Sequence, residues 1–153
     1  MNTETTLRSN LVLVKNPQLF KKVIENTGIE VDIKDDNKTV VMYSYDETFN
    51  DDLIAVKHKV TGEYVTGGCS YYDFEELLDD EGIYDYENYE EVPLTTFIQD
   101  QLEDDQVLVI KENANEGVRW LYSGAALISK NEIKYLNFDQ LCKEEEIKMK
   151  GVL

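Results

Sequence analysis

The chain has 153 residues, of which 42% are hydrophobic and 31% are charged, and its formal net charge is −17. This length and composition are typical of a folded domain with a sizeable core, and they exclude a disordered chain. No apolar run approaches the length of a membrane-spanning helix, and residues 1–16 lack the pattern of a secretory signal. We therefore expect one cytoplasmic domain over residues 1–153.

The first half of the chain predicts two helices among several strands. After a short strand at 11–15, Asn16 caps a helix with Pro17 at its first position, and Gly28 lies where that helix ends. Two hairpins follow, because alternating apolar residues flank turn residues. A second helix comes next, with Asp73 as its cap and Glu76 three positions on. Their predicted ranges are 29–34 with 38–45, 52–60 with 62–67, and 73–80 for the helix.

The second half predicts an acidic segment, a helix, three strands and a last helix. The helix after the acidic segment begins at Val92-Pro93. Its apolar face holds four residues that we expect to be buried: Leu94, Phe97, Ile98 and Leu102. Strand 106–111 has little polarity, so we expect it at the centre of its sheet and most of 107–110 buried. Strands 118–129 and 132–136 complete a meander, and Asn137 caps the last helix, 137–150.

This element order predicts an α+β fold with four helices and a largely antiparallel sheet, because hairpins dominate and no strict βαβ alternation occurs. In sequence, the predicted order is β-α-β-β-β-β-α, the acidic segment, then α-β-β-β-α. Residues 71–78 and 135–142 are similar, which is consistent with an internal duplication of about 11–78 and 93–148. The alternative is that similar strand-to-helix junctions need similar caps.

The negative charge is concentrated in one third of the chain. Between Lys59 and Lys111 there is no Lys or Arg, and residues 60–110 contain fifteen acids. The other residues carry 17 acids and 15 bases. Segment 79–91, DDEGIYDYENYEE, alone has seven acids and three tyrosines. A general solubility adaptation would distribute the charge along the chain, so this block indicates a specific acidic surface.

The sequence offers little material for catalysis or metal binding. His58 is the only histidine, and Cys69 and Cys142 are far apart, so we expect no catalytic triad and two reduced thiols. If Gly82 is aligned with the glycine of an EF-hand loop, Leu77 takes the first ligand position, where it cannot bind calcium. We therefore predict no catalytic residue, no metal site and no cofactor.

The acids and tyrosines instead predict a surface that binds a basic partner. Two arrangements of carboxylates have a spacing near that of nucleic-acid phosphates. One is a separation of one helical turn, expected for Asp100, Glu103 and Asp104. The other is every second residue of an extended segment, expected for Asp85 and Glu87. Tyrosines add apolar contact area and are frequent at interface hot spots. The predicted partner site is Asp79, Asp80, Glu81, Tyr84, Asp85, Tyr86, Glu87, Tyr89, Glu90, Glu91, Asp100, Glu103, Asp104 and Asp105.

A local resemblance points in the same direction. The stretch IYDYENY, residues 83–89, resembles the I-x-D-Y-E-x-aromatic stretch of ArdA-type antirestriction proteins, with Ile83, Asp85, Tyr86, Glu87 and Tyr89 carrying the match. Those proteins are acidic DNA mimics from mobile elements that block restriction enzymes. In size and acidity the chain is also similar, as a class, to phage anti-CRISPR proteins.

The sequence therefore predicts a stoichiometric acidic binding protein, not an enzyme. Its expected target is a basic, nucleic-acid-binding surface of a DNA-targeting host defence protein, and the resemblance implies inhibition of the antirestriction or anti-CRISPR type. The alternative is an immunity-type acidic partner of another basic protein. Neither interpretation predicts that the chain itself binds nucleic acid or a membrane, because its own field repels phosphate.

Overall fold

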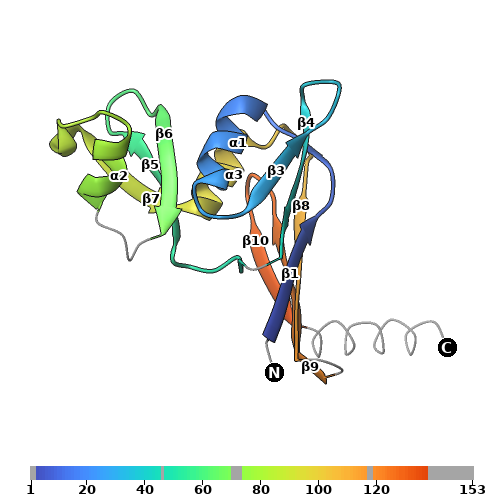
Figure 1. Cartoon of the computed structure of the whole chain (residues 1–153). Helices are drawn as coiled ribbons and strands as arrows, with labels where there is room; N and C mark the ends of the chain where they lie inside the picture. Colours follow the sequence, from blue (N-terminus) through green and yellow to red (C-terminus); the bar gives the residue numbers. More distant parts are fainter. Residues whose placement is uncertain (1–2, 46, 70–73, 117–118, 138–153) are drawn as a thin grey trace.

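The computed structural model describes residues 3–45, 47–69, 74–116 and 119–137, which form two antiparallel sheets and three α-helices. Figure 1 shows four layers: α2 lies outside the smaller sheet, α1 and α3 lie between the two sheets, and the larger sheet forms the opposite side. The helices are α1 (Pro17–Glu25), α2 (Phe74–Asp80), α3 (Leu94–Gln101) and the short 3₁₀ helix η1 (Tyr86–Asn88).

The larger sheet has seven strands in the order β10-β9-β8-β1-β4-β2, and β3 also pairs with β4. Its strands are β1 (Thr3–Ser9), β2 (Val12–Leu13), β3 (Glu30–Ile33), β4 (Thr39–Ser44), β8 (Leu108–Glu116), β9 (Arg119–Ile128) and β10 (Ile133–Asn137). The predicted hairpin β3–β4 and the meander β8–β9–β10 are confirmed. β8 lies between β9 and β1, the central position that its low polarity predicts.

The smaller sheet has three strands in the order β6-β5-β7. They are β5 (Leu53–His58), β6 (Tyr64–Cys69) and β7 (Tyr89–Pro93). β5 and β6 form the predicted hairpin, and β7 adds to the other side of β5, so that Val56 lies between Thr66 and Glu91. Since β7 pairs only with β5 among the described strands, the acidic segment supplies one edge of this sheet.

The prediction of an α+β fold with four helices is wrong, because the described residues are mainly β, with ten strands and three helices. Two of the strands show no apolar pattern that could predict them. β1, TETTLRS, is polar, yet its backbone pairs with β8 along its whole length. β7, YEEVP, is dominated by charge and follows the acidic run directly. The predicted helix 137–150 lies outside the described residues, except Asn137, at which β10 ends.

The start of α1 follows the predicted capping chemistry. The side chain of Asn16 accepts a hydrogen bond from the backbone N–H of Leu19 at 3.1 Å, and Pro17 takes the first helical position, where its missing N–H has no cost. Gly28 follows the helix with φ +98°, a conformation that favours glycine. The local sequence therefore sets both ends of this helix.

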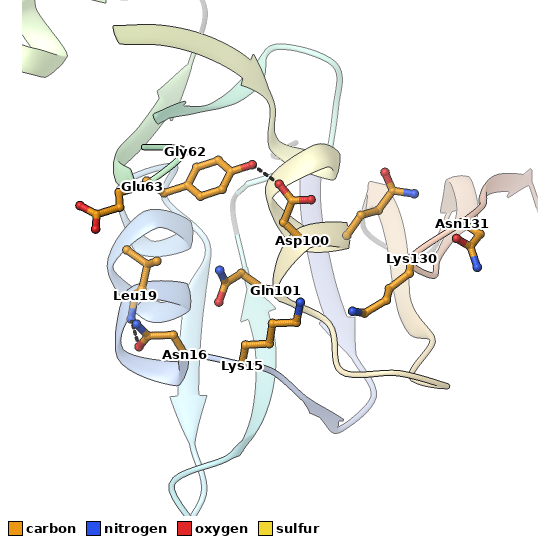
Figure 2. A pocket seen from close by; sticks show the side chains of 11 residues that line it. Lys15, Asn16, Leu19, Gly62, Glu63, Asp100, Gln101, Lys130 and Asn131 are labelled. Carbon is orange, nitrogen blue, oxygen red and sulfur yellow. Dashed lines mark hydrogen bonds between the residues drawn. The ribbon is translucent and has the colours of Figure 1, made fainter. Parts of the chain in front are cut away.

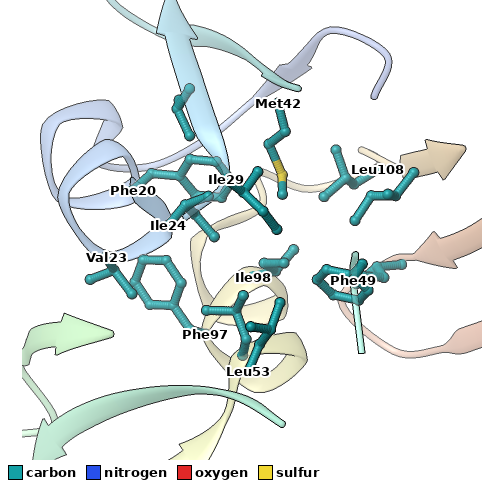
Figure 3. Close-up of a cluster of buried hydrophobic side chains, with 14 of the residues drawn as sticks. Phe20, Val23, Ile24, Ile29, Met42, Phe49, Leu53, Phe97, Ile98 and Leu108 are labelled. Atoms are coloured by element: carbon teal, nitrogen blue, oxygen red, sulfur yellow. The ribbon is translucent and has the colours of Figure 1, made fainter. Parts of the chain in front are cut away.

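The main core fills the space between the two sheets, around α1 and α3 (Figure 3). Phe97 stacks on Phe20 of α1 with ring centroids 5.9 Å apart and meets Tyr64 of β6 edge-on at 4.8 Å. The residues predicted for the apolar face of α3 are all buried: Leu94, Phe97, Ile98 and Leu102. Of the strand residues 107–110, Leu108 and Ile110 are buried, Val109 is half-buried and Val107, just before β8, is 43% exposed, because successive side chains of a strand point to opposite faces. The prediction that most of this stretch is buried therefore holds for two of its four residues.

The smaller sheet also carries a second, satellite core on its outer face. Leu53 and Ala55 of β5 join the main core, whereas Ile54 and Val56 face the other way and contact Leu78 of α2. Half-buried residues complete this cluster: Val65, Phe74, Leu77, Ile83, Tyr86 and Tyr89. The acidic segment is thus attached to the protein through its own apolar residues.

Two consecutive glycines allow helices to approach β6 closely from both faces. A Cβ atom at Gly67 would lie 2.5 Å from the backbone oxygen of Val23 in α1. At Gly68 it would meet a terminal methyl group of Leu77 in α2 at 2.9 Å. These glycines therefore have a packing role, one for each helix.

We expect Gly67→Ala to lower the free energy of unfolding by about 1–3 kcal/mol, because a backbone oxygen cannot move aside without shifting α1. The matched change Gly68→Ala should be less destabilising, since only the flexible end of Leu77 must move. Urea unfolding of the two variants measures the difference. Equal losses would show that the close approach of α1 does not limit this position.

Candidate functional site

Most of the net charge belongs to the part of the chain that forms the smaller sheet and its helices. Residues 51–105 contain 17 acids and two lysines, whereas the remaining residues contain 15 acids and 13 Lys or Arg. In Figure 1, α2 and the smaller sheet lie at the end of the molecule remote from the larger sheet. We call residues 74–91, which form α2, η1 and the first part of β7, the acidic end.

Helix α2 has one apolar face and one acidic face. Leu78 is buried, and Phe74 and Leu77 are half-buried in the satellite core. The opposite face exposes four acids one turn apart in pairs: Glu75, Glu76, Asp79 and Asp80. Glu75 and Glu76 are absent from the predicted site, although the helical period of this segment places them beside Asp79 and Asp80. No basic residue lies in the last turn, where the helix dipole favours cations, so the two aspartates there oppose the stability of α2.

The chain between α2 and β7 is ordered by its own hydrogen bonds. Gly82 ends α2 with φ +75°, and the Ile83 N–H donates to the Leu78 carbonyl at 2.9 Å. Asn88 donates its side-chain N–H to the Asp85 carboxylate at 3.0 Å, which is the main reason why the pKa of Asp85 is below its usual value. Because Glu87 lies within η1, the expected extended spacing of Asp85 and Glu87 is wrong.

The three predicted contact tyrosines have different environments. Tyr86 packs on the satellite core and donates its hydroxyl to Asp79, a bond that raises the Tyr86 pKa to about 12. Tyr89 also packs there and meets His58 edge-on, with ring centroids 5.0 Å apart. Tyr84 is 71% exposed. Of the three, Tyr84 therefore offers the largest area to a partner, and the other two support the structure of the acidic end.

Some acids of the acidic end have basic neighbours, and others have none. Glu81 lies 2.7 Å from Lys22 of α1, and the longer pair between Glu90 and Lys57 of β5 measures 3.9 Å. Both pairs are solvent-accessible, so their contribution to stability is small. The exposed acids with no hydrogen bond or ion pair to any described residue include Asp80, Glu87 and Glu91. These carboxylates are the most available to a basic partner.

The other predicted acids do not lie on a common helix face, because α3 ends at Gln101. Leu102 has an extended backbone, forms a bridge to Val14, and is completely buried. Burial of this leucine in the main core turns the chain away from the helical path. The predicted helical spacing of Asp100, Glu103 and Asp104 is therefore wrong.

These acids lie against other elements instead. Asp100 accepts a hydrogen bond from the Tyr64 hydroxyl at 2.5 Å. Burial, followed by this bond and the Asp100 charge, raises the Tyr64 pKa. Asp104 pairs with Lys130 at 3.2 Å, beside the turn between β9 and β10, and Asp105 lines the same surface hollow. The predicted site is thus divided between the acidic end and a second group around the end of α3, where Asp100 contacts the smaller sheet and Asp104 a turn of the larger one.

His58 has a structural role in the turn that follows it. Its Nδ1 accepts hydrogen bonds from the backbone N–H groups of Val60 and Thr61 at 3.1 and 3.2 Å, which fixes the turn between β5 and β6. Cys69 is a buried free thiol, and Cys142 lies outside the described residues. Within the ranges that the structure describes, no group of three His, Cys, Asp or Glu side chains is arranged to hold a metal ion.

We expect His58→Ala to lower the free energy of unfolding by about 0.5–2 kcal/mol, through loss of these turn hydrogen bonds, and to leave partner binding unchanged. His58→Asn should recover part of that loss, because an Asn side-chain oxygen can accept from the backbone two residues ahead. Thermal unfolding and a binding assay on both variants test this. A folded His58→Ala protein without biological activity would instead indicate catalysis.

No family model, no curated protein and no solved structure matches this chain. None of the helices in the described part of the chain is long and apolar enough to cross a membrane.

Proposed function

We propose that this protein acts by stoichiometric binding, using its acidic end to occupy a basic, nucleic-acid-binding surface of another protein. The proposed target is a DNA-targeting host defence protein in the cytoplasm, such as a restriction or CRISPR nuclease. The observation that supports this proposal is the charge of the acidic end, nine acids and no Lys or Arg in residues 74–91, with exposed carboxylates that no described residue neutralises.

The spacing of the carboxylates supports nucleic-acid mimicry. On the exposed face of α2, Glu75 and Asp79, like Glu76 and Asp80, are one helical turn apart, which places their Cβ atoms about 6 Å from each other. Phosphates along one DNA strand follow each other at 3.4 Å of rise, and roughly twice that distance along the winding backbone. A Lys or Arg array that binds DNA can therefore meet the carboxylates of α2 at similar intervals.

The energetics of the acidic end also favour a binding role. Like charges repel one another in this layer, and the last turn of α2 holds two aspartates that oppose the helix dipole. Both features reduce stability, and of these two aspartates only Asp79 has a side-chain contact within the described part of the chain, with the Tyr86 hydroxyl. A basic partner would offset this repulsion in the complex, and complementary charge would also accelerate association.

The test is displacement of a fluorescent DNA duplex from purified nucleases, followed by anisotropy while this protein is added. We expect stoichiometric displacement from at least one nuclease and no binding of the protein to the duplex alone. Polyglutamate of matched charge is the control for nonspecific competition. Tight binding of a basic protein without DNA displacement would favour the immunity-type alternative, and direct binding to duplex DNA would contradict the proposal.

We expect Tyr84→Ala to weaken binding to such a nuclease by about tenfold, mainly by faster dissociation, because an exposed aromatic ring in an acidic surface is suited to an interface anchor. The matched control is Tyr135→Ala, which removes a 56% exposed tyrosine from β10 in the larger sheet. Surface plasmon resonance separates the two rate constants. Equal dissociation rates for the two variants would show that Tyr84 makes no specific contact.

A further inference from the structure

A cavity of about 800 Å³, lined by no residue of the acidic end, lies where four segments distant in sequence meet (Figure 2). Its walls come from the start of α1, the turn between β5 and β6, the end of α3, and the turn between β9 and β10. Charged side chains of both signs line it, which distinguishes this cavity from the uniformly negative acidic end.

One wall of the cavity donates hydrogen bonds. Lys15 and Lys130 come from opposite ends of the chain, and Figure 2 shows their side chains on the same side of the cavity. Lys130 has a carboxylate partner, Asp104 at 3.2 Å, whereas Lys15 has none among the described residues. Lys15 also immediately precedes the capped first turn of α1, where the helix dipole is positive. This wall therefore presents two ammonium groups, and Asp104 pairs with only one of them.

The facing wall accepts hydrogen bonds. Glu63 is exposed, and Asp100 holds the Tyr64 hydroxyl at 2.5 Å, which leaves capacity on its carboxylate for further donors. Gln101 lies between the two walls, beside Lys15, whose backbone N–H donates to the Gln101 carbonyl at 2.7 Å. Gln101 is only 8% exposed, and its side-chain oxygen has no hydrogen-bond partner among the described residues. Buried amide oxygens are almost always satisfied, so this oxygen indicates that a donor group is missing from the site.

We propose that this cavity binds a small zwitterionic molecule, with a carboxylate held by Lys15 and Lys130 and an amino group held by Gln101, Asp100 and Glu63. The inference goes beyond the proposed function, because the site does not belong to the acidic end. A simple anion would meet two carboxylates and the negative field of the whole protein, and a simple cation would meet two lysines. A molecule with both charges complements both walls.

The test is a titration of the intact, ¹⁵N-labelled chain with glycine, β-alanine and γ-aminobutyrate, followed by NMR. Acetate, butyrate and butylamine serve as fragments with one charge, all at constant ionic strength. We expect at least one zwitterion to give saturable shifts at the Gln101 side-chain amide and at Lys15 and Gly62, with affinity about tenfold above that of either fragment. The absence of saturable shifts, or equally tight binding of a fragment, would overturn the proposal.

The Lys15→Gln variant provides the residue-level test, because this lysine has no ion pair in the described structure whose loss could unfold the chain. We expect its affinity for the zwitterion to fall about tenfold, and Lys38→Gln, in the exposed turn between β3 and β4, to change nothing. Unchanged affinity in Lys15→Gln would overturn the assignment. Neither measurement uses a protein partner, so the result is independent of the test of the acidic end.

Discussion

Replacing Phe97 with alanine is expected to lower the free energy of unfolding by about 3–5 kcal/mol. Phe97 is completely buried and joins α3 to two other elements, because its ring stacks on Phe20 of α1 and meets Tyr64 of β6. Its removal would leave a cavity at the centre of the main core, where two helices and both sheets meet and cannot collapse independently. Few other single substitutions should destabilise the protein as much.

Urea unfolding measures this loss as a shift of the midpoint at constant slope. Tyr135→Ala, which removes a ring of similar size from an exposed position on β10, should change the free energy by no more than about 0.5 kcal/mol. A loss below about 1 kcal/mol for Phe97→Ala would contradict the burial of this ring between the two sheets.

Reversing the charge of Asp80, Glu87 and Glu91 to lysine is expected to weaken binding to a nuclease target by at least about tenfold, mainly by slower association. These exposed carboxylates have no partner in the described part of the chain, so their replacement removes no structural contact. A reversal at Asp85 or Asp104, by contrast, would also break the hydrogen bond to Asn88 or the ion pair with Lys130.

The matched control reverses three exposed acids near the larger sheet, Asp32, Asp35 and Glu47, and therefore changes the net charge equally. Stopped-flow association at several salt concentrations compares the two variants. The difference should be large at 0.1 M salt, where the screening length is about 10 Å, and small at 1 M, where it is about 3 Å. Equal association rates for both variants at 0.1 M would show that total charge matters and the acidic end does not.

The sequence predicts the local structure of this protein better than its architecture. Asn16, Pro17 and Gly28 delimit α1 because capping depends on neighbouring residues. The hairpin turns are similarly local. β1 could not be predicted, because its polar side chains give no pattern and its pairing with β8 joins residues about one hundred positions apart. The end of α3 could not be predicted either, because burial of Leu102 in the tertiary core determines it.

The same limit applies to the candidate site. The concentration of acids in residues 60–110 can be read directly from the amino-acid sequence, so no structure is needed to predict it. Which groups are available to a partner depends on tertiary contacts. Tyr84 and Tyr86 are two residues apart in one acidic run, yet one ring is exposed and the other packs on the satellite core. An irregular segment has no repeating pattern of buried and exposed positions, so the sequence could not show which of these two tyrosines is exposed.

The small size of the satellite core has a consequence for the dynamics of the acidic end. Of the described residues, only Ile54, Val56 and Leu78 are buried in that cluster, and the main core lies on the opposite face of β5. α2 and η1 can therefore open and expose their backbone amides to hydrogen exchange at a lower free energy than global unfolding requires. A partner that binds only the closed layer reduces the open population by mass action. Partner binding and slower hydrogen exchange of α2 and η1 then report on the same equilibrium between the closed and the open layer.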